Sequence, residues 1–265
     1  MTGKIYLNFD LEEFDIPCEY GQPIKEEEQI EVTSEGLKRL LELLQKKGLK
    51  ATFFTTASFA LNKTALAKNL LELGHEIASH GLDHKPKAKE EDLFLSKKIL
   101  EEISSVPVLG YRSPRFRPVD PQALLSHGYA YNSSINPTWL PGRYNYLHYP
   151  RKIFSHQGLV QVPISTTPIV RLPLCWLSFK NLPPSLFNLF SWITLKEKGY
   201  LNIFFHPWEF APIQNYAMPK AAKSLDGKAL LKRLEEYINW LMSLEVAFAK
   251  LGEVVGPVGN SPTLK

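Results

Sequence analysis

The sequence predicts an α/β fold, a (β/α) barrel formed by one domain. Three observations support this prediction. Short apolar runs alternate with amphipathic stretches through the first half, the chain has 265 residues, and 44% of them are hydrophobic, enough for one large core. Strands that alternate with helices imply a parallel sheet, and continued alternation over this length favours a barrel over an open sheet.

The first strand and helix are predicted at residues 4–10 and 32–48. The run KIYLNFD is short, apolar and rich in strand-forming residues. In the second segment, four leucines recur at helical spacing, Thr33 or Ser34 is the expected N-cap, and Gly48 ends the helix. Together they form one βα unit.

The alternation then continues to residue 128. Further strands are predicted at residues 49–56, 75–80 and 108–114, and helices at residues 64–74, 89–103 and 119–128.

The second half has a less regular pattern. Aromatic, proline-punctuated sequence up to about residue 198 predicts long loops with a few irregular strands. Residues 199–210 then predict a strand, residues 226–245 the longest helix, and residues 246–250 the last strand. The turn-rich tail, residues 256–265, is expected to be frayed.

Composition excludes several classes of protein. The net charge of +4, without a run of Lys and Arg, gives no indication of a nucleic-acid partner. Cys18 and Cys175 are isolated, which excludes a disulfide framework and a CxxC zinc or redox pair. The sequence begins without the pattern of a signal peptide and has no apolar run of about eighteen residues, so we expect a cytoplasmic protein.

Six polar side chains follow the predicted strands. In a parallel barrel, the carboxyl ends of the strands meet at one face, so side chains at these positions should converge. They are Asp10, Glu12, His80, His84, Arg112 and His206.

Two of these short segments together predict a metal site. Asp10 and Glu12 are two apart on an extended chain and point to the same side. His80 and His84 share a face if the chain makes one helical turn there. One carboxylate and two imidazoles suit a divalent ion, whereas His75, at the start of its strand, should be structural at the opposite end of the barrel.

Four motifs in order carry a family resemblance: FDLEEF, SHGLDH, GYRSPRF and FFHPWEF. They resemble the polysaccharide deacetylases of carbohydrate esterase family 4, especially a branch with Asp-x-Glu first and His-Pro-Trp-Glu last. The match runs from about residue 5 to residue 250. The resemblance implies a distorted (β/α) barrel with about seven parallel strands and metal-dependent removal of N-acetyl groups from amino sugars.

The resemblance also implies roles for individual residues. Asp10 corresponds to the catalytic base and His206 to the acid. Glu12, His80 and His84 correspond to the metal ligands.

Further roles concern the surroundings of these residues. Arg112 corresponds to an arginine that orients the base, and a backbone N–H near Arg115 to an oxyanion donor. The substrate-binding candidates are Arg115, Phe116, Trp208 and Glu209, although the two aromatic residues also suit packing and Glu209 also suits anchoring of its loop.

One position departs from the family pattern. Asn132 stands where related sequences tend to carry an aspartate that partners the histidine acid, and residues 121–196 contain no Asp or Glu. An asparagine can orient His206 but cannot stabilise its protonated form by charge. An acidic partner is therefore expected elsewhere, with Asp226 and Glu209 as candidates.

The same acid-free segment combines cations with large apolar side chains. It either packs on the core or contacts an anionic membrane surface, where it would reach a lipid-linked or acidic glycan. Its cations are Arg143, Arg151, Lys152, Arg171, Lys180 and Lys196, and its largest apolar residues include Trp176, Phe179, Phe187, Phe190 and Trp192.

The predicted function is a metal-dependent N-deacetylase. Its expected substrate is an N-acetylated amino sugar in a polysaccharide, a peptidoglycan-like glycan or a lipid-linked glycan precursor. The expected cofactor is one divalent ion, zinc first, with cobalt, nickel and manganese also suited to the ligands. The alternatives are hydrolysis of an N-formyl sugar or a cyclic amide, and a non-catalytic carbohydrate-binding protein.

Overall fold

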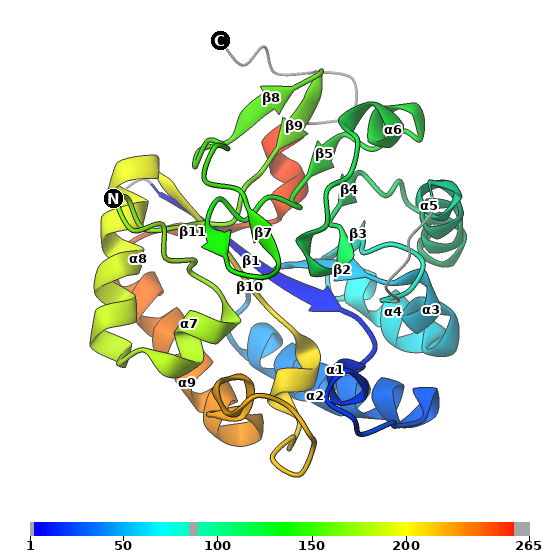
Figure 1. Ribbon diagram of the computed structural model, residues 1–265, viewed down its shortest axis with the longest axis horizontal. Helices are drawn as coiled ribbons and strands as arrows, with labels where there is room; N and C mark the ends of the chain where they lie inside the picture. The colour runs from blue at the N-terminus through cyan, green and yellow to red at the C-terminus, as the bar shows by residue number, and fades with distance from the viewer. Residues whose placement is uncertain (1–2, 85–89, 257–265) are drawn as a thin grey trace.

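The computed structural model describes residues 3–84 and 90–256 and has a curled, mostly parallel sheet that forms a half-barrel (Figure 1). This confirms the predicted α/β class. In spatial order the strands are β10 (Tyr200–Phe205), β1 (Lys4–Leu11), β2 (Thr52–Thr55), β3 (Glu76–Ser79), β4 (Gly110–Tyr111), β5 (Tyr131–Asn132), β9 (Leu159–Gln161) and β8 (Phe154–His156). All neighbours pair in parallel except β8 with β9, and β11 (Ala247–Ala249) pairs in parallel with the first half of β1.

The gap between β9 and β10 is bridged by residues outside the ladder. The backbone N–H of Ser165 donates to the carbonyl of Asn202, 2.9 Å away. The side-chain amide of Asn202 donates to the carbonyls of Val162 and Pro163, each at 3.1 Å. These bonds curl the sheet, so that the carboxyl ends of distant strands lie near one another.

Helices cover the outside of the sheet (Figure 1). Of the four leucines predicted to face the core from residues 32–48, Leu37, Leu40 and Leu44 have no exposed surface and Leu41 is 5% exposed. The helices are α1 (Ile16–Glu19), α2 (Glu26–Lys46), α3 (Ala57–Asn62), α4 (Thr64–Glu72), α5 (Glu91–Ser104), α6 (Pro121–Ser126), α7 (Trp176–Asn181), α8 (Pro184–Lys198) and α9 (Gly227–Met242).

The predicted start of α2 is wrong. The helix begins at Glu26, where glutamates in the first turn complement the positive end of the helix dipole. Thr33 and Ser34 lie inside the helix and donate to the carbonyls of Glu12, at 2.8 Å, and Ile30, at 2.7 Å. As a result α2, with 21 residues, is longer than α9, with 16, contrary to the expectation from sequence.

The segment up to residue 198 contains more helix than predicted. It holds α7 and α8, as well as short strands and the hairpin of β6 (Trp139–Leu140) with β7 (Tyr144–Asn145). In this segment Phe179 and Phe187 are 2% and 0% exposed, so packing on the core is the correct interpretation for them. The predicted helix start at residue 89 and residues 257–265 of the predicted frayed tail lie outside the described residues.

Within residues 3–84 and 90–256, no helix combines the length and apolarity that crossing a membrane requires. Both cysteines are free thiols, Cys18 exposed and Cys175 buried.

His75 has the structural role predicted for it. Its Nδ1 accepts a hydrogen bond from the backbone N–H of Ala51 at 3.1 Å, and its ring lies edge-on against Phe53 at 5.2 Å. Burial lowers the pKa of His75 to about 4. The native protein therefore keeps this ring neutral at mildly acidic pH.

This predicts a pH dependence of stability. The unfolded chain binds a proton at His75 below its ordinary pKa of 6.5, while the folded chain does not until about pH 4. The free energy of unfolding should therefore fall as the pH decreases through this window. In the variant His75→Gln, the glutamine side chain can accept the hydrogen bond from Ala51 but has no group that titrates in this range. Urea unfolding should therefore show a smaller decrease in the free energy of unfolding for this variant than for the parent.

His156 is exposed and provides the control. The free energy of unfolding of His156→Gln should change with pH as that of the parent does. Equal losses of stability in the parent and His75→Gln would contradict the assignment.

Candidate active site

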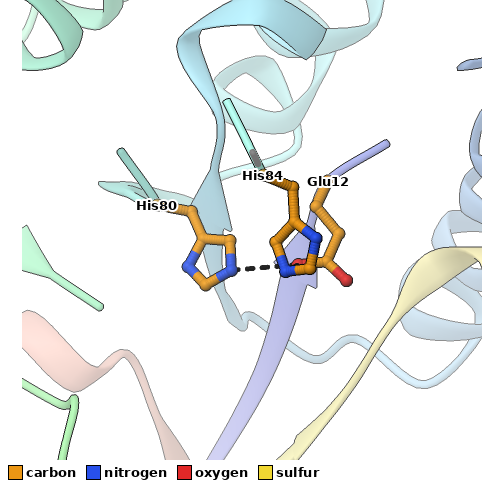
Figure 2. A group of neighbouring side chains, drawn as sticks. All are labelled: Glu12, His80 and His84. Atoms are coloured by element: carbon orange, nitrogen blue, oxygen red, sulfur yellow. Dashed lines mark hydrogen bonds and ion pairs between the residues drawn. The ribbon is translucent and has the colours of Figure 1, made fainter. Parts of the chain in front are cut away.

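Three side chains converge at the carboxyl edge of the sheet as a candidate metal centre (Figure 2). Glu12 follows β1, and His80 follows β3. The Oε2 atom of Glu12 lies 3.0 Å from Nε2 of His80 and 3.0 Å from Nε2 of His84. All three residues are buried, and their ligand atoms lie within 4.8 Å of one another. The structure thus brings together the three residues that the sequence predicted as metal ligands.

A bend, not the expected helical turn, brings the two histidines together. Gly81 has φ of +80°, in the left-handed region that favours glycine. Its carbonyl accepts from the N–H of Ala57 at 3.0 Å, and the carbonyl of Leu82 accepts from Ser58 at 2.9 Å, which fixes the bend on α3. The imidazole rings lie 6.0 Å apart and nearly parallel, at 22°.

Both histidine rings are oriented by an acceptor on the far nitrogen. Nδ1 of His80 donates to the carbonyl of Arg112, and Nδ1 of His84 donates to Oδ1 of Asp15, each at 2.9 Å. With Nδ1 held in this way, Nε2 of each ring points to Glu12, where it would offer its lone pair to a bound cation in place of a proton. This arrangement is typical of metal-ligating histidines, so the residues fit a divalent ion.

Asp15 is a candidate site residue that the sequence did not predict. It also accepts from Nη2 of Arg115 at 2.8 Å, so it links a cavity arginine to a metal-ligand candidate. Its sequence position, one residue before Ile-Pro, suggests only a helix cap. Its contact with His84, 69 positions away, comes from the tertiary structure.

The charges of these groups are strongly coupled. Burial alone would raise the pKa of Glu12, but His84 and His206 outweigh it and hold the pKa below its usual range. Burial lowers the pKa of His84, but Glu12 and the hydrogen bond to Asp15 raise it to about 9. The pocket around Glu12 thus favours positive charge, which a bound cation would supply in place of the proton.

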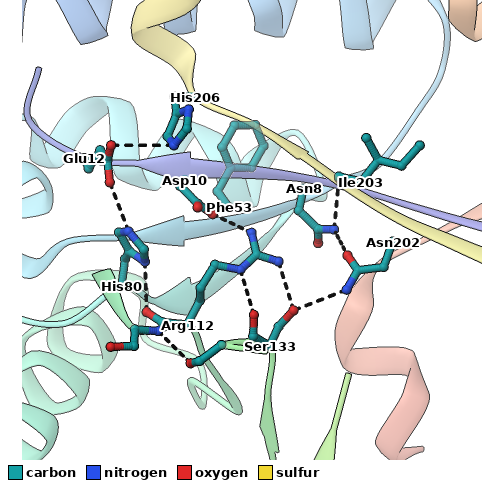
Figure 3. Close-up of polar contacts among 12 residues, drawn as sticks. Asn8, Asp10, Glu12, Phe53, His80, Arg112, Ser133, Asn202, Ile203 and His206 are labelled. Atoms are coloured by element: carbon teal, nitrogen blue, oxygen red, sulfur yellow. Dashed lines mark hydrogen bonds and ion pairs between the residues drawn. The ribbon is translucent and has the colours of Figure 1, made fainter. Parts of the chain in front are cut away.

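Asp10 and Arg112 form a buried ion pair beside this centre (Figure 3). Nη1 of Arg112 lies 2.5 Å from Oδ1 of Asp10. The rest of the guanidinium donates to Ser133, with Nε 3.2 Å from the carbonyl and Nη2 2.9 Å from the hydroxyl. It also lies 3.9 Å above the ring of Phe54. The orientation of the Asp10 carboxylate is therefore fixed.

His206, at the end of β10, has a charged partner in Glu209. Nδ1 of His206 lies 3.0 Å from Oε1 of Glu209, whose Oε2 lies 2.8 Å from Nζ of Lys180. Burial lowers the pKa of His206, but Glu12 and Glu209 outweigh it and raise the pKa. Nε2 of His206 lies 3.7 Å from Oε1 of Glu12, so the imidazole stands next to the metal centre.

Asn132 does not take the role expected for it. Its amide nitrogen donates to Gln161 at 2.8 Å, and its amide oxygen accepts from the backbone N–H of Ser134 at 3.1 Å. Asp226 accepts from the N–H of Ile213 and is not the partner of His206 either. Of the two acidic candidates, Glu209 holds the histidine.

Lys180 is the buried cation beside this carboxylate. It belongs to the segment for which core packing and membrane contact were both open, and of these it takes core packing: its side chain has no exposed surface and pairs with Glu209. Its Nζ also donates to the carbonyl of Ala222 at 2.8 Å. The ion pair compensates the charge of a carboxylate that is 0% exposed.

The substrate-binding prediction is wrong for Trp208 and Glu209. Both are 0% exposed, because the 3-10 turn Pro207–Phe210 packs them beneath the cavity. Nε1 of Trp208 donates to Oε1 of Glu12 at 3.3 Å, while Oε2 of Glu12 faces His80 and His84. Trp208 therefore orients a metal-ligand candidate.

The candidate site opens into a cavity of about 390 Å³. Arg115 and Phe116 line it as expected, and Trp176 lines it close to His206. Arg115 and Phe116 have φ of +59° and +55°, a sparsely populated conformation for residues other than glycine. The site residues in its lining are Asp10, Glu12, His80, His84 and His206.

Comparison with known proteins agrees with this geometry. Residues 3–118 match the family model described as polysaccharide deacetylase. This part of the chain is similar to the polysaccharide deacetylases. A peptidoglycan deacetylase from Helicobacter pylori is 29% identical over 108 residues, which cover 38% of this chain and 37% of that relative. The chain thus spans little more than a third of the length of this curated relative.

Solved structures show the same fold. A protein from Mycobacterium smegmatis assigned as a polysaccharide deacetylase matches with a TM-score of 0.66 and 18% identity, over 95% of this chain and 88% of that chain. PuuE allantoinase matches with a TM-score of 0.65 and 16% identity, also over 95% and 88%. At these identities the likeness concerns the fold alone.

The site geometry predicts graded effects on metal affinity. His80→Ala and His84→Ala each remove a ligand candidate and should abolish tight zinc binding. Asp15→Ala keeps all the ligands but frees the ring of His84, so affinity should fall about 10–100-fold. Calorimetric titration of chelator-treated protein with zinc measures each constant.

Two variants control this experiment. His75→Ala removes a histidine outside the site, and Glu19→Ala removes a different partner of Arg115 without touching His84. Both should bind zinc as the parent does. If Glu19→Ala weakened binding as much as Asp15→Ala, the effect would run through Arg115 and the role given to Asp15 would be wrong.

The buried Lys180–Glu209 pair predicts strong coupling in stability. Lys180→Met leaves a buried carboxylate without its cation and should lower the free energy of unfolding by about 3–5 kcal/mol. Adding Glu209→Gln removes that charge, so the double variant should be more stable than Lys180→Met alone. Urea unfolding of the parent, both single variants and the double variant tests this, and additive effects would show that the pair is not coupled.

Proposed function

We propose that the protein is a metal-dependent deacetylase that removes N-acetyl groups from amino sugars of a glycan. One observation carries this proposal: a set of one carboxylate and two imidazoles lies between a buried aspartate and a histidine, all lining one cavity. The names of the relatives support the same activity. The assignment to the branch with Asp-x-Glu and His-Pro-Trp-Glu motifs, and the organisation of the chain as one catalytic domain, belong to the proposal.

Amide hydrolysis needs an activated water, a polarised carbonyl and a proton for the leaving amine. Glu12, His80 and His84 would hold the metal ion, with Asp15 and the carbonyl of Arg112 orienting the two rings. When bound there, a divalent ion lowers the pKa of water and polarises the carbonyl. Zinc suits this ligand set, as do cobalt, nickel and manganese.

Asp10 is placed to accept the proton of the attacking water. It lines the cavity two residues before Glu12, and Nη1 of Arg112 donates to its Oδ1. Because Arg112 is fixed by Ser133, it also prevents the carboxylate from turning away. The backbone N–H near Arg115 is the proposed donor to the developing oxyanion.

His206 is placed to give a proton to the leaving nitrogen. Its Nδ1 is held by Glu209, so Nε2 faces the cavity beside Glu12. The charge of Glu209 favours the protonated imidazole, which a general acid requires. Lys180 keeps Glu209 ionised although that carboxylate is completely buried, since the ion pair lowers its pKa.

Asp10→Asn tests the proposal most directly. It should keep the fold and the metal but lower kcat at least ~10²-fold, because the amide cannot take up the proton. Acetate release from N-acetylglucosamine oligomers measures turnover, and zinc titration of the same variant verifies the metal site.

A matched control is Asp120→Asn, which changes the cap of α6 away from the cavity and should leave turnover unchanged. Parental activity in Asp10→Asn would remove Asp10 as the base.

A substrate panel separates the alternatives. Deformylation of N-formyl glucosamine or opening of a cyclic amide such as allantoin, without acetate release, would keep the metal hydrolase but change the acyl group. Binding of zinc and chitin oligomers without turnover of any of these substrates would indicate a non-catalytic carbohydrate-binding protein.

A further inference from the structure

Two hairpins at the mouth of the cavity expose large apolar side chains. The β6–β7 hairpin exposes Trp139 to 60% and Leu140 to 38%. A second hairpin, residues 166–173, closed by a bridge between its first and last residues, exposes Ile169 to 92% and Val170 to 75%. We call these four side chains the apolar rim.

The two hairpins form one continuous surface. Nη1 of Arg171, in the second hairpin, donates to the carbonyl of Tyr149 at 2.9 Å and lies 3.4 Å from the carbonyl of Pro137, on either side of the first hairpin. Leu140 of the first hairpin and Pro173 of the second both line the active-site cavity. The rim therefore lies next to the path by which substrate enters.

The shape of the rim favours a membrane over a protein partner. Its side chains lie at the tips of two projecting hairpins, whereas a stable protein interface requires a broad complementary surface of roughly 1,000 Å² or more. A bilayer interface accepts projecting apolar tips without a matching shape. Single exposed apolar residues are ordinary, but a tryptophan, a leucine, an isoleucine and a valine on adjacent hairpins form a patch.

The charges around the rim suit anionic lipid headgroups. Arg143, between β6 and β7, is exposed and has no ion-pair partner within the described ranges. Lys152 is exposed, and the guanidinium of Arg171 binds backbone carbonyls, while Arg151 is neutralised by Glu197 at 2.6 Å. The segment 121–196 contains no Asp or Glu of its own; outside it, Glu197 pairs with Arg151 and Glu19 lines the same cavity as Arg143. Exposed cations beside apolar tips are typical of peripheral binding to an anionic surface.

We infer that the apolar rim docks the protein on an anionic membrane surface, with the mouth of the active-site cavity at the level of the headgroups. The contact is peripheral, since no described helix spans a membrane. The inference extends the proposed function by placing the glycan close to a bilayer. It does not rest on that function, because docking needs neither the metal nor Asp10.

Vesicle flotation tests the inference directly. The parent should bind phosphatidylcholine vesicles that contain phosphatidylglycerol, bind pure phosphatidylcholine vesicles far more weakly, and lose affinity as salt is added. The double variant Ile169→Ser/Val170→Ser should lose at least about tenfold in affinity. Arg143→Gln should lose about fivefold, and only on the anionic vesicles.

The matched control removes two equally exposed apolar side chains elsewhere. Leu61 on α3 and Phe94 on α5 are 56% and 55% exposed, and neither residue lines the active-site cavity. Leu61→Ser/Phe94→Ser should bind vesicles as the parent does. Asp10→Asn should also bind normally, so failure of the deacetylase proposal and failure of docking are distinguishable.

Three results would overturn the inference. The first is a parent that does not float with anionic vesicles. The second is an Ile169→Ser/Val170→Ser variant that floats as well as the parent, and the third is the same loss in the Leu61→Ser/Phe94→Ser control. Self-association of the parent that this rim variant abolishes, without vesicle binding, would make a second copy of the chain the occupant of the rim.

Discussion

The side chain of Arg112 carries a full positive charge at a position with no exposed surface. Transfer of such an ion from water costs several kcal/mol unless its surroundings compensate it. Asp10 supplies the opposite charge, Ser133 accepts two hydrogen bonds, and Phe54 presents the face of its ring. The backbone carbonyl of Arg112 also accepts a hydrogen bond from Nδ1 of His80. One residue therefore fixes both the proposed base and a metal-ligand candidate.

The curled sheet makes this arrangement possible. The N–H of Arg112 donates to the carbonyl of Ser79 at 2.9 Å, and the N–H of Ser133 donates to the carbonyl of Tyr111 at 2.8 Å. The ends of β3, β4 and β5 are thereby brought level. Asn202 then joins the opposite edge by donating to the hydroxyl of Ser133 at 3.3 Å (Figure 3). A change in the register of β3 or β4 would therefore displace His80 or Arg112 relative to Asp10.

The parts of the site that local pattern determines could be predicted from the sequence. Glu12, His80 and His206 directly follow apolar strands, and the ends of parallel strands meet, so their convergence follows from the fold class. The partners Asp15 and Lys180 could not be predicted, because tertiary packing alone brings them to His84 and Glu209. The left-handed bend at Gly81 was missed for a related reason: a spacing of four residues suits a helical turn and a tight bend equally well.

Among the helices and strands, too, those that a local sequence pattern determines were predicted, and those that depend on tertiary packing were not. The positions of β1 to β4, β10 and β11 were predicted because their runs are short and apolar. α7 and α8 were missed because aromatic residues lie on several sides of them and prolines interrupt the segment, which obscures a helical period. The start of α2 was missed because Thr33 resembles a cap, whereas its hydroxyl serves the carbonyl of Glu12, a contact between distant parts of the chain.

The position of Glu209 has a consequence for how this type of site can change over time. The histidine and its tuning carboxylate are three residues apart in one short turn, so they are inherited as a unit. Asn132, which contacts Gln161 and Ser134, can therefore vary without changing the partner of His206. The turn also depends on a residue outside it, however, because the buried carboxylate of Glu209 pairs with Lys180 from α7. Transfer of the turn to a related scaffold would require a buried cation from a separate helix as well.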